Sequence, residues 1–144
     1  MDLERDFGWT LRAVSVAFQS EAIAAVSHLP SGPRGYLVLL AASEGSGQSQ
    51  LAIARRLGVD KTVMTYLVDA LVEQGLILRE SDPADRRVRQ LVLTDTGRAT
   101  LDAARAEIAA VETRLLSSLS ADDAERFRTL LAAVAASSSG IDCS

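Results

Sequence analysis

Two adjacent arginines, Arg86 and Arg87, lie within a polar stretch of the sequence, residues 81–88, that also contains a proline and two aspartates. A guanidinium stays charged at physiological pH and donates to phosphate oxygens and to acceptors at base edges. Short apolar runs, residues 77–80 and 89–94, flank this stretch and predict two antiparallel strands that place the arginines at a hairpin tip. In that position Arg87 is expected to enter a narrow DNA minor groove, while Arg86 either binds phosphate or shares that role.

A second set of polar side chains shares one face of a predicted helix over residues 61–74. This face consists of Lys61, Thr62, Thr65 and Tyr66. Lysine can donate to guanine or to phosphate, threonine can bond base edges or touch thymine methyls, and the tyrosine is expected on a phosphate. The opposite face is apolar and is assigned to the core: Val63, Met64, Leu67 and Leu71. The face therefore suits a helix that reads the major groove, although an ordinary solvated surface is the alternative for the two threonines.

A shorter helix is predicted before this one, over residues 47–57, with Gly58 at the turn and Asp60 as the cap of the second helix. Helix, turn, helix and basic-tipped hairpin follow one another within about 50 residues. That order is typical of a winged helix-turn-helix, which can fill two grooves of a DNA duplex at once.

The start of the shorter helix offers a further contact for DNA. Gln48 and Ser49 open it, where free backbone N–H groups suit a phosphate, and plain capping is the alternative. Gln50 is placed to complete a capping box with Gly47 or Ser46.

Long apolar-periodic segments flank the winged region. Helices are predicted over residues 3–28, 34–43 and 96–117 and from residue 120 onward. The fold class is therefore mainly α with a small β-hairpin wing (α+β), in a single domain of residues 1–144. Within it, the winged lobe is assigned to 34–97, dimerisation helices to 1–29 and 98–137, and a loose tail to 138–144.

The charge of the chain is unevenly distributed. The net charge is −4, yet residues 47–100 contain eight Lys and Arg against seven Asp and Glu, so the remainder carries −5. The middle of the chain is thus free to approach phosphate, while the acidic flanks keep non-specific DNA affinity modest. With 48% hydrophobic and 24% charged residues the composition is globular, and no apolar run is long enough to span a membrane. No signal peptide is recognisable, so the protein is expected in the cytoplasm.

The supply of reactive side chains argues against an enzyme. One cysteine, Cys143, and one histidine, His28, exclude an internal disulfide and make a zinc site implausible. No paired carboxylates or nucleotide-binding loop stand out, so neither a catalytic site nor a cofactor is expected. Cys143 is read as a thiol in the terminal tail, with a redox switch as the alternative.

Several of these segments resemble the MarR family of bacterial regulators. The similarity rests on Leu57-Gly58-Val59-Asp60, Asp82-Pro83-Ala84-Asp85-Arg86-Arg87 and Leu93-Thr94-Asp95-Thr96-Gly97, at their spacing in this chain. The flanking helices also lie where the family places them, so the resemblance covers nearly the whole chain.

The resemblance implies a homodimer that binds an inverted repeat in double-stranded DNA as a repressor and is released by a small aromatic or anionic effector. It implies that Asp60 and Asp85 hold the wing through carboxylate–guanidinium pairing. Four residues are candidates for the effector pocket, with core packing as the alternative: Trp9, Phe18, His28 and Tyr36. The competing function is a winged helix that serves as a protein-interaction or dimerisation module without an operator of its own.

Overall fold

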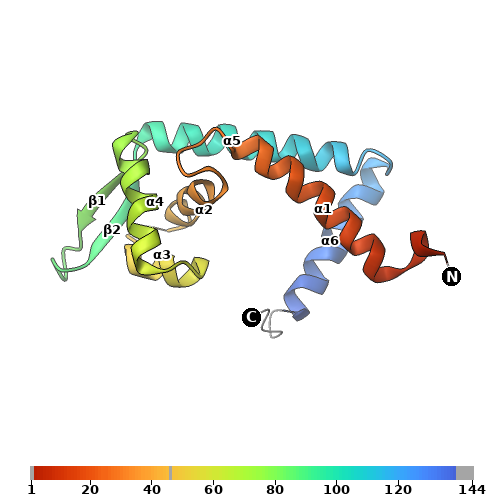
Figure 1. The fold of residues 1–144 in the computed structure, drawn as a ribbon, viewed down its shortest axis with the longest axis horizontal. Coiled ribbons are helices and arrows are strands. Elements are labelled where there is room, and N and C mark those ends of the chain that lie inside the picture. The colour runs from red at the N-terminus through yellow and green to blue at the C-terminus, as the bar shows by residue number, and fades with distance from the viewer. Residues whose placement is uncertain (1, 46, 139–144) are drawn as a thin grey trace.

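The computed structural model describes residues 2–45 and 47–138. Its elements are η1 (Leu3–Arg5), α1 (Phe7–Val26), α2 (Gly32–Ser43), α3 (Gln50–Leu57), α4 (Lys61–Glu73), β1 (Ile77–Ser81), β2 (Arg89–Leu93), α5 (Asp95–Leu115) and α6 (Ala121–Ser138). Figure 1 shows a lobe that consists of α2, α3, α4 and the hairpin. An arm that consists of α1, α5 and α6 extends away from this lobe. The predicted fold class, mainly helical with a small hairpin wing, is confirmed.

The core of the lobe forms around α2. Val38 and Leu39 are fully buried there, against Ile53 of α3 and Leu71 of α4. Pro33 lies in the first turn of α2, where its missing N–H would have had no partner. The helix begins at Gly32, two residues before the predicted start.

The hairpin is attached to the helix-turn-helix by its second strand. β1 and β2 pair antiparallel, with Ile77 opposite Leu93. On its other edge β2 meets the residues just before α3, because the Leu91 N–H donates to the Gln48 carbonyl at 3.0 Å. The wing and α3 are therefore joined by main-chain hydrogen bonds.

The passage from β2 into α5 explains the glycine of the Leu-Thr-x-x-Gly motif. Thr94, predicted as the end of the strand, instead caps α5: its hydroxyl accepts from the Gly97 N–H at 2.9 Å and donates to the Gly75 carbonyl at 2.6 Å. A Cβ on Gly97 would lie 1.9 Å from the Leu76 carbonyl oxygen. Only glycine allows α5 to begin so close to the chain that leaves α4.

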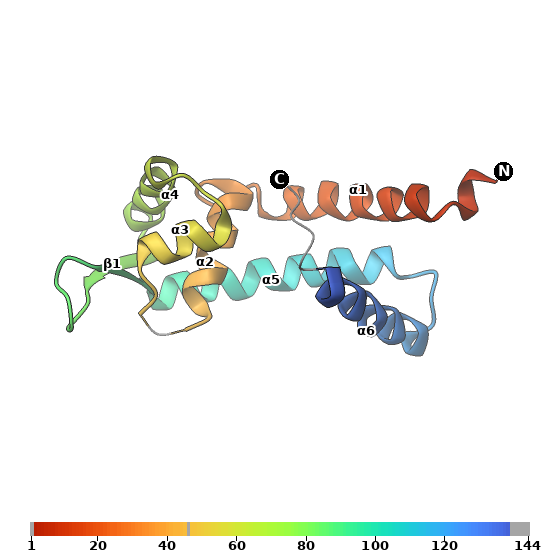
Figure 2. The ribbon, with the colours of Figure 1, turned by 90° about the horizontal axis from the view of Figure 1, so that it is seen from below.

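In the arm, α1 packs beside α5 (Figure 2), where Arg114 and Glu21 form an ion pair at 2.9 Å. The predicted first helix, residues 3–28, is interrupted at Asp6, whose carboxylate accepts from the Trp9 N–H at 2.8 Å and caps α1. An aspartate competes with the helix for backbone donors, so it starts a helix rather than continuing one.

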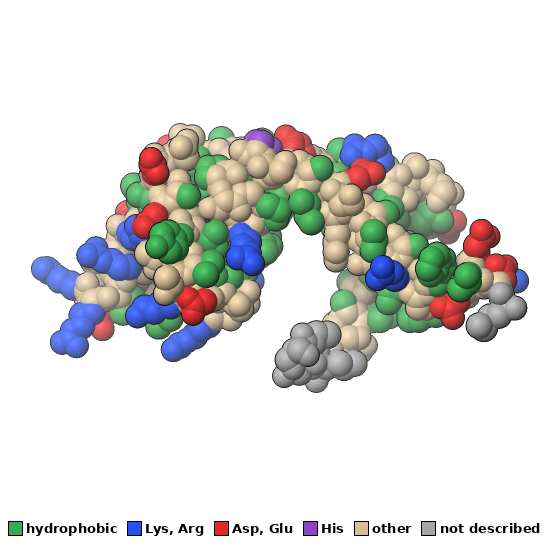
Figure 3. Space-filling model, viewed as in Figure 1, with side chains coloured by type: hydrophobic (Ala, Val, Ile, Leu, Met, Phe, Trp, Pro, Cys, Tyr) green, Lys and Arg blue, Asp and Glu red, His purple; other side chains and the backbone are tan. Residues whose placement is uncertain are grey.

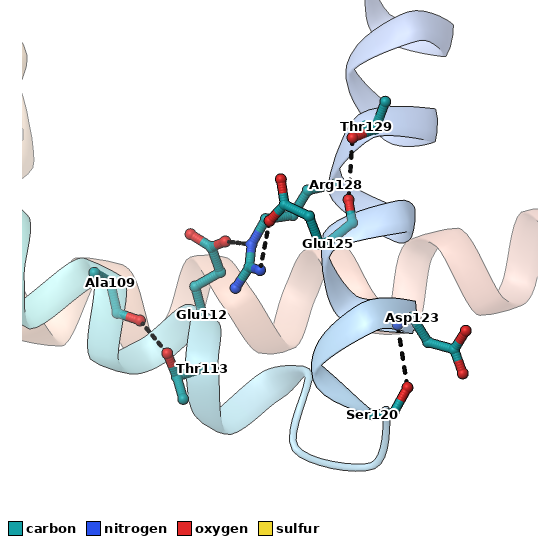
Figure 4. Close-up of polar contacts among 8 residues, drawn as sticks. All are labelled: Ala109, Glu112, Thr113, Ser120, Asp123, Glu125, Arg128 and Thr129. Carbon is teal, nitrogen blue, oxygen red and sulfur yellow. Dashed lines mark hydrogen bonds and ion pairs between the residues drawn. The ribbon is translucent and has the colours of Figure 1, made fainter.

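The last helix makes few contacts with its own chain. Ala124 is the one buried residue of α6, and Arg128 links this helix to Glu112 of α5 and pairs with Glu125 at 3.5 Å (Figure 4). The hydrogen bond to Glu112 raises the pKa of the Arg128 guanidinium above its usual value. α6 extends to Ser138, the first residue of the predicted tail; Cys143 and the rest of that tail lie outside the described residues.

Candidate nucleic-acid interface

The reading face predicted for α4 is exposed as a unit. Lys61, Thr62, Thr65 and Tyr66 all face solvent, and Tyr66 is 71% exposed. Met64, Leu67 and Leu71 are buried on the opposite side. The predicted polar outer face is exposed and three of the four predicted core residues are buried, whereas the fourth, Val63, is half-buried at the edge of the core.

The wing tip is shaped by two aspartates. The Asp82 carboxylate accepts from the Ala84 N–H at 2.8 Å, and the Asp85 carboxylate accepts from the Arg87 N–H at 3.0 Å. Such bonds are typical of aspartate in turns. Arg86 and Arg87 are exposed beyond this turn, and neither guanidinium forms an ion pair within residues 2–45 and 47–138. Figure 3 shows Lys and Arg side chains projecting from the hairpin end of the lobe.

Asp60 and Asp85 act on the backbone in this structure, which differs from the pairing that the resemblance implied. Asp60 caps α4, because its carboxylate accepts from the Thr62 N–H at 2.8 Å. Asp85 orders the turn that carries Arg87. Neither carboxylate contacts a guanidinium in the part of the chain described. In this structure the two carboxylates therefore cap a helix and order a turn.

Gln48 and Ser49 are engaged inside the protein. The Gln48 amide donates to the Ala41 carbonyl at 3.1 Å, and the Ser49 hydroxyl accepts from the Ala52 N–H at 3.0 Å. Ser49 is thus the cap of α3, and the helix starts at Gln50 rather than at residue 47. The groups that a phosphate could still bind here are backbone N–H groups at the start of α3.

Sequence reasoning missed a polar chain that joins the wing to α4. Arg79 of β1 donates to Asp69 at 2.5 Å and to the Gln50 amide oxygen at 3.1 Å. The Gln50 amide nitrogen lies 3.4 Å from the Thr65 hydroxyl. Gln50 was expected in a capping box, but its side chain reaches α4 instead. A sequence clue existed in Arg79, a charged residue that directly follows the apolar pair Ile77-Leu78 in the predicted strand.

The effector candidates do not come together at a described hollow. One hollow of about 300 Å³ lies between α2 and the α3–α4 turn, and its lining includes Arg34, Leu37, Leu57, Val59, Asp60 and Val63. Another lies along β2 and the start of α5. Trp9, Phe18, His28 and Tyr36 line neither, and Tyr36 packs against the buried clusters of both lobe and arm.

Two other features are absent from the described ranges. No group of three or more His, Cys, Asp or Glu side chains in residues 2–45 and 47–138 is placed to hold a metal ion. Across the same residues, no helix has the length and apolar character needed to cross a membrane.

An exposed polar helix face beside a basic hairpin tip, on one compact lobe, defines a winged helix-turn-helix DNA-binding protein. Residues 35–88 match the family model described as "MarR family". The solved structure of the YusO protein from Bacillus subtilis is 27% identical, with 92% of this chain and 94% of that chain covered and a TM-score of 0.75. The chain belongs to the MarR family, whose members are transcriptional regulators rather than enzymes.

Two solved structures of the transcriptional repressor CouR are similar to this chain. Bound to a 23-mer DNA duplex, it is 32% identical over 92% of this chain and 94% of that chain, with a TM-score of 0.73. CouR from Rhodococcus jostii RHA1 bound to p-coumaroyl-CoA is 30% identical over 94% and 95% of the two chains, with a TM-score of 0.70.

Proposed function

We propose that this chain acts in the cytoplasm as a homodimeric repressor that binds an inverted-repeat operator and leaves it when a small ligand binds. The observation that carries the proposal is the shared exposure of the α4 polar face and the arginine tip of the wing on one lobe. Lys61, Thr62, Thr65 and Tyr66 would enter the major groove, and Arg86 and Arg87 would follow the minor groove and the phosphates. CouR, described as a repressor and solved on a DNA duplex, supports this assignment.

A second copy of the chain would cover the apolar faces of the arm. Large apolar side chains are exposed along α1 and α6: Phe7, Trp9, Leu11, Val14, Val16, Ile23, Phe127, Leu130, Leu131 and Val134. Many large apolar side chains exposed on two helices of the arm indicate an interface. Two lobes related by a two-fold axis would present two reading helices to the two halves of an inverted repeat.

The test of this proposal is selection of operator sequences from random duplex DNA, followed by binding titrations at two salt concentrations with competitor DNA. We expect an inverted repeat bound tightly in the presence of competitor. Weak binding that depends steeply on salt, without a selected sequence, would instead favour a winged helix that serves as a protein-interaction module.

The hollow beside the α3–α4 turn is the proposed effector site. Arg34 would bind a carboxylate, the leucines and valines would contact an aromatic ring, and Asp60 would accept from a hydroxyl. CouR bound to p-coumaroyl-CoA supports an aromatic acid derivative as the class of ligand. Because Asp60 also caps α4, a ligand there would act on the start of the reading helix. Trp9, Phe18, His28 and Tyr36 remain the second candidate set.

This assignment predicts which variant loses its response. A panel of hydroxylated aromatic acids is titrated into the protein–operator complex, and release of DNA is followed by fluorescence anisotropy. Arg34→Gln should lose the response, while Arg105→Gln, an exposed arginine on α5, should keep it. If the Arg34 variant responds like the unmodified protein, the site lies elsewhere.

A further inference from the structure

The polar chain missed by sequence reasoning ends on a residue of the reading face. Starting from Asp69, it runs through Arg79 and Gln50 to Thr65, and so crosses α4, β1 and α3. Arg79 has a side chain only 27% exposed and is held by Asp69, so the guanidinium presents a fixed donor to Gln50. The Gln50 amide is therefore oriented, with its oxygen on Arg79 and its nitrogen toward Thr65.

The hydroxyl of Thr65 is already occupied by the protein. It donates its one hydrogen to the Lys61 carbonyl at 3.1 Å and accepts from the Gln50 amide nitrogen at 3.4 Å. A hydroxyl has a single donor, so Thr65 has none left for an acceptor at a base edge. What remains for DNA is one acceptor lone pair of the hydroxyl and the Cγ2 methyl, and of these the methyl is the group that can pack against a thymine.

We propose that Thr65 recognises a thymine through its 5-methyl group, and that Gln50, held by Arg79, is the positioning residue that keeps the Thr65 methyl outward. The thymine methyl is a distinctive apolar feature of the major groove, and threonine methyls pack against it. This inference rests on the proposed function, because it assigns chemistry to the same reading helix.

Gln50 is needed to fix the rotamer of Thr65, because a threonine within a helix can adopt two χ1 rotamers. Its hydroxyl can bond the preceding turn in either of two χ1 rotamers, which point the methyl in different directions. The hydrogen bond from Gln50 favours one of them. Without Gln50, Thr65 would populate both rotamers, and the contact with the thymine methyl would be lost part of the time.

The test removes the methyl from DNA rather than from the protein. In the selected operator each symmetric pair of thymines is replaced by deoxyuridine, which differs by the 5-methyl group alone, and Kd is measured by fluorescence anisotropy. At one pair we expect the unmodified protein to bind the uracil operator more weakly than the thymine operator. The expected difference in Kd is about fourfold for each half-site, because one buried methyl is lost there. We call the ratio of the Kd for the uracil operator to the Kd for the thymine operator the uracil sensitivity of that pair.

Protein variants then assign the sensitivity to a side chain. Thr65→Ser, which lacks the methyl, should bind the thymine and uracil operators alike at that pair, while Thr65→Val should keep the difference. Thr96→Ser removes a methyl from an exposed threonine in the first turn of α5, outside the proposed DNA contacts, and serves as the matched control, with the uracil sensitivity at that pair unchanged. Gln50→Ala should reduce the sensitivity, whereas a merely structural role would weaken both operators equally.

Three results would overturn the proposal. They are an operator at which no thymine pair is sensitive to uracil, a sensitivity that persists in Thr65→Ser, and a Gln50→Ala variant with undiminished sensitivity. The failure of the proposed function is distinguishable, because it would appear earlier, as the absence of any selected sequence.

Discussion

At the scale of single residues, Arg87 is placed where a cation is most useful to a DNA-binding hairpin. The Asp85 carboxylate fixes its backbone N–H at 3.0 Å, and no acidic group of the described residues pairs with its guanidinium. The backbone is thus ordered while the charged group stays available for DNA.

We therefore expect Arg87→Ala to weaken operator binding by roughly 1–3 kcal/mol, and to make binding less dependent on salt. The measurement is a Kd titration at several salt concentrations with a dimer shown to be folded by circular dichroism. Arg105→Ala, which removes an exposed arginine from α5, should leave Kd nearly unchanged. Normal operator affinity in Arg87→Ala would contradict the minor-groove assignment.

The exposure of a residue could be predicted from the sequence where it depends on one element alone. The outer face of α4 follows from helical periodicity, and its exposure is confirmed by Lys61, Thr62, Thr65 and Tyr66. The partners of Gln48 and Gln50 could not be predicted, since these amides bond the Ala41 carbonyl and Arg79, which lie on other elements. Each amide can bond many different groups, and the sequence does not show which of them the tertiary packing brings close.

At the scale of elements, the start of α5 depends on the absence of a side chain at Gly97. Gly97→Ala would place a methyl 1.9 Å from the Leu76 carbonyl oxygen, which is main chain and cannot swing aside. We expect this change to lower the free energy of unfolding by about 1–3 kcal/mol, as overpacking does. Urea denaturation at fixed protein concentration measures it, because the stability of a dimer depends on concentration.

Gly8→Ala provides the contrast for this prediction. Gly8 lies in the first turn of α1, and a Cβ there would meet only the Asp6 side chain at an ordinary 3.5 Å. That change should be neutral or stabilising by up to about 1 kcal/mol, because alanine favours a helix. Equal effects of the two substitutions would show that the contact with Leu76 does not matter.

The elements themselves were predictable because their ends carry local chemistry. Gly58, predicted at the turn, adopts positive φ directly after α3, and Gly75 does the same after α4. The errors arose where one residue suits two structures: Thr94 fits a strand by propensity, yet its hydroxyl caps α5. Asp6 similarly divides an apolar-periodic segment that periodicity alone treats as one helix.

At the scale of the whole molecule, charge and apolar surface are separated along the chain. Residues 47–100 carry +1, and the remainder carries −5. The segment with least repulsion toward phosphate therefore contains the reading helix and the wing. The exposed apolar side chains of α1 and α6 belong to the arm, at the other end of the molecule (Figures 1 and 3). This division allows two copies to associate through their arms while both lobes face DNA.

The apolar face of α6 gives the sharpest test of that arrangement. Leu130 is 57% exposed in the single chain. A two-fold interface over this face would bury the Leu130 side chain of each of the two copies. Leu130→Glu replaces two buried leucines by two carboxylates, so dimerisation should weaken by at least about 3 kcal/mol. Analytical ultracentrifugation measures the shift toward monomer, and helical content by circular dichroism shows whether the chain still folds.

Thr129→Glu is the matched control, because it introduces the same carboxylate on the neighbouring residue, away from the apolar stripe, where the Thr129 hydroxyl only donates to the Glu125 carbonyl. This variant should remain a dimer and bind the operator normally. Leu130→Glu should also lose most operator affinity, since a single lobe contacts only one half of an inverted repeat. If Leu130→Glu stays dimeric, the second copy does not cover this face of α6, and the spacing of the two reading helices must be set by another part of the arm.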